Sequence, residues 1–267
     1  MVRVIVIALM LMAPVAWGQS LSSSSSSDEV VDMGDDNAFS FGDGSTDDPF
    51  SMTAWVRRAS SSASAGSIAA KFNGGAGAAR EWIFQTEAND LLLILLRDES
   101  AAATLQIISV NPIEEIKWTH VAFTYDGSGT AGGLTLYTNG LVFASADVSA
   151  GSYTAMENTT SDLLLLSQEG DGSIVNNWNG DVIDWRLFSR ELSAADVLSI
   201  RNGGKLYDGL VFQHLGNAHI EPPEEIPAGT TLRSAFGDHA GTVRNDSGES
   251  VKSQPSPKTF RAKGVTY

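Results

Sequence analysis

The sequence predicts an all-β protein, an antiparallel sandwich of two sheets with one short helix on the C-terminal side. Three segments carry this prediction, residues 50–57, 118–127 and 134–140. In each of them apolar and polar residues alternate with a period of two, as in strands with one face in a core and one in solvent. Each segment also runs into turn residues, which is typical of consecutive antiparallel strands.

Other strands follow from different patterns. Residues 91–96 and 163–166 are continuous apolar runs, as expected of strands buried on both faces. Asn139 and Gly140 give the strongest hairpin signal in the chain, because a type I′ turn needs positive φ at both central residues. The strand at residues 50–57 divides into a predicted core face of Phe50, Met52, Ala54 and Val56 and an opposite face of Ser51, Thr53, Trp55 and Arg57.

One helix is predicted after Leu192. Ser193 and Asp196 have the spacing of a capping box, and Leu192 with Val197 can form the hydrophobic staple. Gly203 and Gly204 are expected to end the helix in the left-handed conformation. The helix is therefore two to three turns long.

Residues 1–18 have the features of a secretory signal peptide. Arg3 is the basic start, an apolar run covers residues 4–15, and Ala16 and Gly18 fit the small-x-small cleavage pattern. The run is too short to cross a bilayer comfortably, so no stable membrane span is expected after cleavage. An uncleaved anchor is the alternative. The predicted location is secreted, either extracellular or in the cell envelope.

The rest of the chain is predicted to divide into three parts. Residues 19–29 form a serine-rich linker, residues 30–245 form the sandwich, and residues 246–267 form a polar tail. Within the sandwich, residues 205–245 are expected to add edge strands, because both termini of such a domain can lie near one edge. The alternative, a separate mini-domain, would be too small and too interrupted by proline to have its own core.

Composition excludes some classes of function. The formal net charge of −15 argues against a nucleic-acid partner, since phosphates would be repelled. The chain contains no cysteine, so the hydrophobic core, with or without metal ions, must hold it together. The absence of disulfides in a secreted protein favours a bacterial or phage-like origin.

Four strings in a fixed order carry a family resemblance: residues 31–35, residues 50–56, residues 118–127, and residues 178–187 followed by Leu192 and Ser193. Together they resemble the laminin G-like and pentraxin-like branch of the concanavalin A-type jelly rolls. The resemblance implies a two-sheet jelly roll used for extracellular recognition. Residues 209–243 are similar to the segment that usually opens such a domain, which implies one domain in rotated order.

The resemblance also suggests calcium. Residues 168–172 are similar to the pentraxin calcium loop, with Glu169 and Asp171 as oxygen ligands, although Gly170 stands where pentraxins carry another side-chain oxygen. A second, structural site could join Asp35 and its neighbours Asp36 and Asn37 to Asp184. The alternatives are an ordinary acidic turn at residues 168–172 and an exposed Asp184 that pairs with Arg186.

A sugar site is expected where an aromatic ring meets amide groups. Trp178 lies among Asn176, Asn177 and Asn179, so the indole could cover the apolar face of a sugar while the amides bind its hydroxyls. Trp82, also near turn residues, is a second stacking candidate. The alternative for these tryptophans is burial in the core.

Catalysis is not expected. The chain lacks the Glu-x-Asp-x-x-Glu pattern of related glucanases, and it has no metalloprotease, serine-hydrolase or phosphate-loop motif. The sequence therefore predicts a non-enzymatic module that binds an extracellular glycan or protein surface, with calcium assistance possible. The alternative is a structural protein of an envelope or phage-like particle without sugar binding. The oligomeric state is left open.

Overall fold

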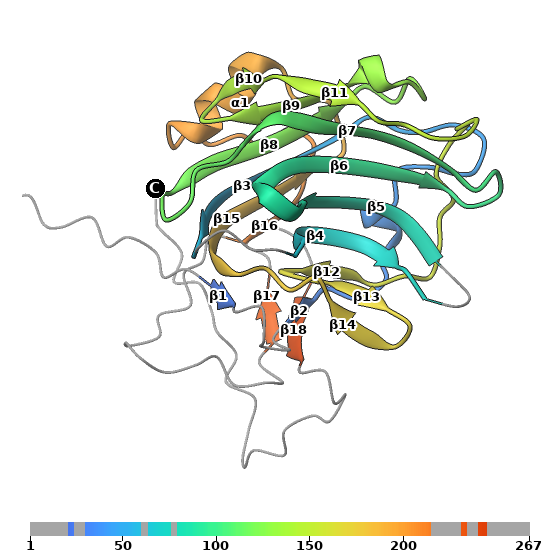
Figure 1. Ribbon diagram of the computed structural model, residues 1–267, viewed down its shortest axis with the longest axis horizontal. Helices are drawn as coiled ribbons and strands as arrows, with labels where there is room; N and C mark the ends of the chain where they lie inside the picture. Colours follow the sequence, from blue (N-terminus) through green and yellow to red (C-terminus); the bar gives the residue numbers. More distant parts are fainter. Residues whose placement is uncertain are drawn as a thin grey trace, which may run out of the picture.

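The computed structural model describes residues 21–23, 30–59, 64–75, 79–214, 231–233 and 240–244. Two β-sheets stack face to face, and one short helix lies on the outside of one sheet (Figure 1). Pairing among the described strands is antiparallel apart from a parallel contact between Glu169 and Asn73, and an isolated parallel bridge joins Arg58 to Glu115. The predicted fold class, an antiparallel two-sheet sandwich with one short helix, is confirmed.

The seven-stranded sheet carries the helix. Its order is β1-β15-β3-β8-β9-β10, with β16 also pairing with β15. Asn139 and Gly140 join β9 to β10 with φ of 50° and 81°, so the predicted positive-φ hairpin turn is present. The strands of this seven-stranded sheet are β1 (Leu21–Ser23), β3 (Phe50–Arg58), β8 (Thr119–Tyr125), β9 (Leu134–Thr138), β10 (Leu141–Phe143), β15 (Gly180–Phe188) and β16 (Leu210–His214).

The eleven-stranded sheet faces it across the core. Its order is β11-β7-β6-β5-β4-β12-β2-β18-β17, and β13 joins it through β4 while β14 pairs with β13. Its strands are β2 (Val30–Asp32), β4 (Gly66–Asn73), β5 (Ala79–Thr86), β6 (Leu91–Asp98), β7 (Ala103–Pro112), β11 (Ser145–Asp147), β12 (Leu163–Leu165), β13 (Gln168–Gly170), β14 (Ser173–Val175), β17 (Thr231–Arg233) and β18 (Ala240–Arg244).

Aromatic side chains fill the space between the sheets. Phe50 of β3 lies 5.1 Å from Phe123 of β8 and 5.7 Å from Trp82 of β5, measured between ring centroids. Phe84 of β5 lies 5.1 Å from Phe123 in an edge-to-face contact. All four rings are fully buried. Such contacts between residues of the two sheets fix how the sheets stack.

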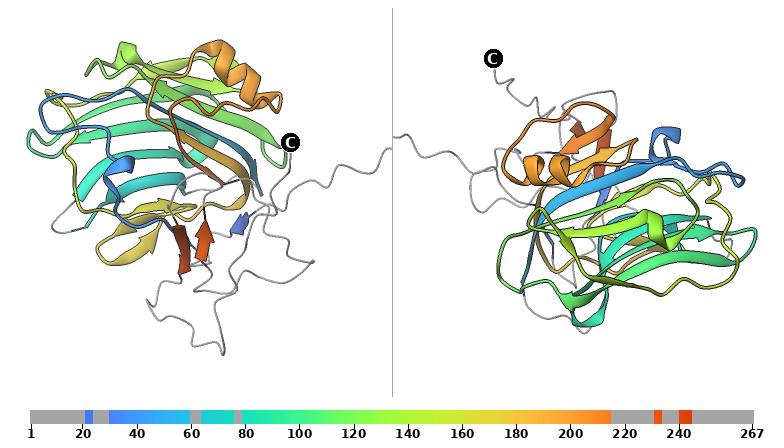
Figure 2. Two further views of the ribbon diagram at one scale, coloured as in Figure 1. Left: turned by 180° about the vertical axis from the view of Figure 1, so that it is seen from behind. Right: turned by 90° about the horizontal axis from the view of Figure 1, so that it is seen from above.

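Helix α1 (Ala194–Arg201) packs on the outer face of the seven-stranded sheet (Figure 2). Ser193 and Asp196 form the predicted capping box, each side chain bonding the other residue's backbone N–H. Val197 and Ile200 bury their side chains against Ala122 and Tyr137 of the sheet. The helix therefore covers one part of this face.

Segments from both ends of the chain pair with the sandwich. Strand β16 pairs with β15, and β18 pairs with β2 at an edge of the larger sheet. Strand β1 pairs with β15 although it lies in the predicted serine-rich linker. Edge pairing uses backbone groups, so a strand can form there without an apolar sequence. The domain boundaries themselves remain a prediction.

The predicted signal peptide (residues 1–18) and polar tail (residues 246–267) lie outside the described residues. In the part of the chain that the structure describes, no helix has the length and apolar character needed to cross a bilayer.

Candidate functional site

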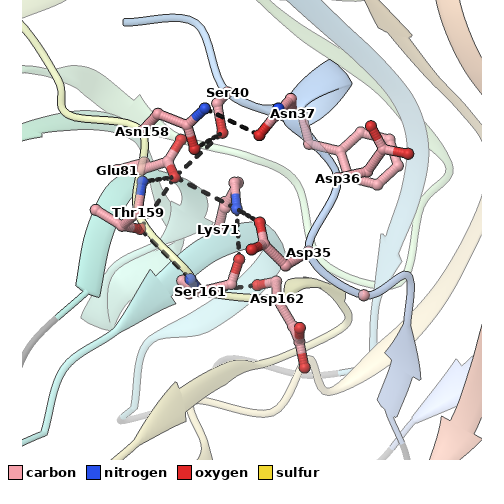
Figure 3. A network of polar contacts seen from close by, with 12 residues as sticks. Asp35, Asp36, Asn37, Ser40, Lys71, Glu81, Asn158, Thr159, Ser161 and Asp162 are labelled. Atoms are coloured by element: carbon pink, nitrogen blue, oxygen red, sulfur yellow. Dashed lines mark hydrogen bonds and ion pairs between the residues drawn. The ribbon is translucent and has the colours of Figure 1, made fainter. Parts of the chain in front are cut away.

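A β-bulge in strand β5 directs a glutamate into the protein. Lys71 of β4 pairs with Trp82, and the next residue, Phe72, pairs with Arg80, so Glu81 has no partner in the ladder. The extra residue re-aims the side chain, as bulges do. Glu81 consequently turns toward Lys71 and toward the loop that contains Thr159 (Figure 3).

Lys71 and Glu81 form a buried ion pair, and the Lys71 ammonium has three oxygen partners. The Lys71 ammonium lies 2.8 Å from Asp35 Oδ1, 3.3 Å from Glu81 Oε1 and 2.5 Å from the Ser161 carbonyl oxygen. Lys71 and Glu81 are both fully buried. Burial raises the pKa of Glu81, and the Lys71 charge and the Thr159 hydrogen bonds act in the opposite direction. This network ties two loops to strands β4 and β5.

Asp35 and Asp184, the predicted structural metal ligands, do not come together. Asp35 is engaged by Lys71 at an end of the eleven-stranded sheet, whereas Asp184 lies in β15 of the other sheet. Arg186 donates to both Asp184 carboxylate oxygens at 2.8 Å. Asp184 is thus paired with Arg186, as the alternative predicted, although it keeps about a fifth of its side chain exposed.

Glu169 and Asp171 lie in the β13–β14 hairpin. Asp171 and Gly172 both have positive φ, 56° and 80°, so the segment is a tight two-residue turn. Within the described residues, no group of three or more His, Cys, Asp or Glu side chains is arranged to hold a metal. A calcium site at either position stays a prediction, because Ca²⁺ can also take backbone carbonyl, amide and water oxygens.

The structure places both predicted sugar-stacking tryptophans in the core. Trp82 donates its indole N–H to the Phe39 carbonyl oxygen at 3.0 Å, and Trp178 lies under the guanidinium of Arg58 at 4.8 Å from the ring centroid. Both rings are 0% exposed, so neither has a face that a sugar could cover. The predicted stacking role needs this correction. Turn-like neighbours in sequence did not imply exposure, because both rings pack into the main core between the sheets.

The three asparagines beside Trp178 are half-buried. The Asn176 carbonyl oxygen accepts from the Ser67 N–H, and the Asn179 carbonyl oxygen accepts from the Ala59 N–H. Asn177 lies between them and is also engaged in contacts within the fold. The segment therefore ties β15 to β3 and β4.

A different tryptophan faces solvent. Trp118 directly precedes β8 and is 37% exposed. Continuing the β3–β8 register by one residue places it opposite Arg57, whose guanidinium lies 5.3 Å from the indole centroid. Asp181 of β15 accepts from Arg57 Nε at 2.8 Å and fixes the guanidinium in place. One face of the indole is thus held by the protein.

A second arginine–tryptophan pair lies beside the first. Trp55 is two residues before Arg57 on the same outer face of β3, and it makes an edge-to-face contact with His120 at 5.4 Å. Arg201, the last residue of α1, lies 5.9 Å from the Trp55 ring centroid. We call Trp55, Arg57, Trp118, Asp181 and Arg201 the outer strip. It lies on the part of the sheet beyond the end of the helix.

A cavity of about 490 Å³ lies close to the outer strip. Lys117, the residue before Trp118, is part of its wall. The other lining residues are Asn89, Asp90, Pro112, Ile113, Glu114 and Glu115. The loop that presents Trp118 thus contributes the carboxylates of Glu114 and Glu115 and the ammonium of Lys117, and Asn89 adds an amide from the β5–β6 connection.

The sequence contained a signal for the outer strip. Trp55 alternates with Ser51, Thr53 and Arg57 on the polar face of its strand, and an aromatic residue among polar ones marks a surface that is not part of the core. Arg201 carried no such signal, because only packing of the helix brings it to Trp55.

A family model described as the concanavalin A-like lectin/glucanases superfamily matches residues 32–198. This range covers more than half of the chain. The chain belongs to the concanavalin A-like lectin/glucanases superfamily. The match confirms the resemblance to laminin G-like jelly rolls. No relative was found among curated proteins.

Solved members and neighbours of the concanavalin A-like fold agree with this assignment. A candidate carbohydrate-binding protein from Bacteroides ovatus is 16% identical, with a TM-score of 0.51, over 85% of this chain and 57% of its own. The CBM40 module of a Ruminococcus gnavus IT-sialidase is 12% identical, with a TM-score of 0.50, over 68% of this chain and 96% of its own. This chain thus spans little more than half of the Bacteroides protein. At these identities the similarity shows the fold.

Proposed function

We propose that the protein is a non-catalytic carbohydrate-binding module whose ligand stacks on Trp118. The observation that carries the proposal is the exposed indole, held from one side by Arg57. An ordered aromatic ring with one open face covers the apolar face of a sugar and loses little entropy on binding. The carbohydrate-binding fold neighbours support the same class of ligand.

Polar groups around the Trp118 ring can orient the bound sugar. Asp181 and Arg57 lie beside it and can bind hydroxyl groups, while Lys117 and the cavity wall extend the polar surface. A few fixed polar groups around an apolar platform are typical of small-ligand sites. The sequence features of residues 1–18 support secretion, so the proposed ligand is an extracellular glycan.

Binding is tested on a glycan array and then by calorimetry with the best ligand. Trp118→Ala is expected to weaken binding about tenfold or more, because a buried tryptophan contact is commonly a dominant one. Tyr207→Ala is the matched control, since Tyr207 is 46% exposed but lies near the other end of β15. Equal melting temperatures would show that both variants fold.

Each result decides between the proposal and its alternatives. Loss of binding in Trp118→Ala alone supports the proposal. A stable assembly that binds no sugar would instead favour a structural protein, and hydrolysis of a polysaccharide panel would favour an enzyme. Repeating the titration in calcium and in EGTA tests the predicted calcium assistance. We expect equal affinities, because Lys71 and Arg186 already neutralise Asp35 and Asp184.

A further inference from the structure

We propose that the outer strip selects anionic saccharides, with Arg201 binding a carboxylate or sulfate of the ligand. This inference rests on the proposed function, since it names the class of sugar that the same surface would bind. It starts from the pairing of each tryptophan of the outer strip with an arginine.

The two arginines differ in how their charge is balanced. Arg57 directs Nε and one terminal nitrogen at the same Asp181 oxygen, at 2.8 and 2.6 Å. Arg201 donates to the Asn202 side-chain oxygen at 2.9 Å, and within the described residues no carboxylate lies at ion-pair distance from it. Arg201 is therefore the uncompensated cation of the outer strip.

The guanidinium of Arg201 is also well placed to bind. Arg201 is exposed, and most of its N–H donors remain available. Its planar fork matches the two oxygens of a carboxylate or sulfate, and contact with Trp55 limits its freedom. An anionic sugar lying along the outer strip could stack on an indole and pair its acidic group with this fork.

The net charge of −15 does not oppose this reading. The Debye length is about 8 Å at physiological ionic strength, so exposed carboxylates elsewhere on the protein are screened. The groups that face the ligand decide its charge preference. On the outer strip these are two guanidinium groups and one carboxylate.

The test compares acidic and neutral glycans on the full chain. The array carries uronic-acid, sialylated, sulfated and neutral oligosaccharides, and desulfated or methyl-esterified forms serve as matched neutral ligands. We expect the best ligands to be acidic and their affinity to fall as sodium chloride is raised. The carboxylated and sulfated arms show which of the two anions is preferred.

Two variants assign the effect to Arg201. Arg201→Gln is expected to weaken the acidic ligand about tenfold, as loss of a charge-assisted hydrogen bond does, and Arg201→Lys should restore part of it. Arg80→Gln is the matched control, because it removes the same charge from the eleven-stranded sheet. Both glutamine variants change the long-range field equally.

The outcomes separate the inference from the function. If neutral sugars bind as well as their acidic counterparts and Arg201→Gln has no effect, the inference is overturned while the proposed function stands. Equal losses in Arg201→Gln and Arg80→Gln would overturn it as well. Absence of binding to every glycan would overturn both.

Discussion

Lys71 shows how this protein accommodates a charge without access to water. Its ammonium contacts oxygens of Asp35, Glu81 and Ser161, and the bulge at Glu81 is what brings the carboxylate within reach. Removing one member of a buried pair leaves the other charge uncompensated, and that cost exceeds the net worth of the pair. The stability of the protein should therefore respond strongly to any change in the Lys71–Glu81 pair.

We expect Lys71→Met to lower the free energy of unfolding by about 3–5 kcal/mol, because Glu81 would be left buried and unpaired. The double variant Lys71→Met, Glu81→Gln should lose less than the two single variants together. Urea denaturation of the wild type, Lys71→Met, Glu81→Gln and the double variant gives the coupling free energy between the two side chains. Additive losses would contradict a direct interaction between the two side chains.

His120 makes folding sensitive to pH. Its ring is buried beside Trp55, and neither ring nitrogen has a hydrogen-bond partner among the residues that the structure describes. Burial lowers the pKa of His120 from 6.5 to about 4. Above pH 6.5 the imidazole is neutral in both the folded and the unfolded chain. Between pH 6.5 and 4 the unfolded chain binds a proton that the folded chain does not, so the free energy of unfolding falls as pH falls.

The expected loss from His120 over this range is up to about 3 kcal/mol. It is measured as the difference in pH dependence between the wild type and His120→Phe, which retains an aromatic ring but cannot titrate. The difference between the two curves isolates His120 from the carboxylates that titrate in the same range. Parallel curves would show that His120 is protonated equally in both states.

At the scale of elements, helix α1 links the sheet to the outer strip. It is eight residues long, too short to be stable alone, so its cap and its packing must hold it. Ser193 caps one end and Arg201 reaches Trp55 from the other. The stability of the N-terminal end of α1 therefore affects the position of Arg201, which is a proposed ligand contact.

Ser193→Ala is expected to cost about 1 kcal/mol, because the Asp196 N–H loses its acceptor. Ser199→Ala, an exposed change within the same helix, serves as the control and should change stability by less than about 0.5 kcal/mol. Thermal or chemical denaturation measures both. Equal effects of the two changes would mean that the capping box contributes nothing.

At the scale of the whole molecule, strands from the C-terminal part of the chain pair with both sheets of the sandwich. Strand β16 covers an edge of β15, and Phe212 within it is buried in the main core. Strand β18 extends the other sheet from β2. A chain that ends before these strands would expose both edges and lose core contacts.

A chain of residues 19–205 is thus expected to unfold at lower denaturant than one of residues 19–245, by several kcal/mol in free energy, since even one large-to-small core change costs about 3–5 kcal/mol. The 19–245 chain should match residues 19–267, because only the polar tail is removed. Denaturation of the three chains tests this. Equal stability of all three would show that the C-terminal strands do not support the domain.

The sequence by itself determined the fold class, several central strands, the hairpin at Asn139 and Gly140, the capped helix and the family. These features depend on alternation and local turn chemistry, which are written in neighbouring residues. The tertiary structure alone decided which aromatic rings reach solvent and which charges meet. Trp82 and Trp178 pack into the core, Lys71 and Arg186 pair with Asp35 and Asp184, and helix packing places Arg201 beside Trp55. The burial of Trp82 and Trp178 and the position of Arg201 arise from contacts between residues far apart in the chain, and no local pattern around these residues encodes them.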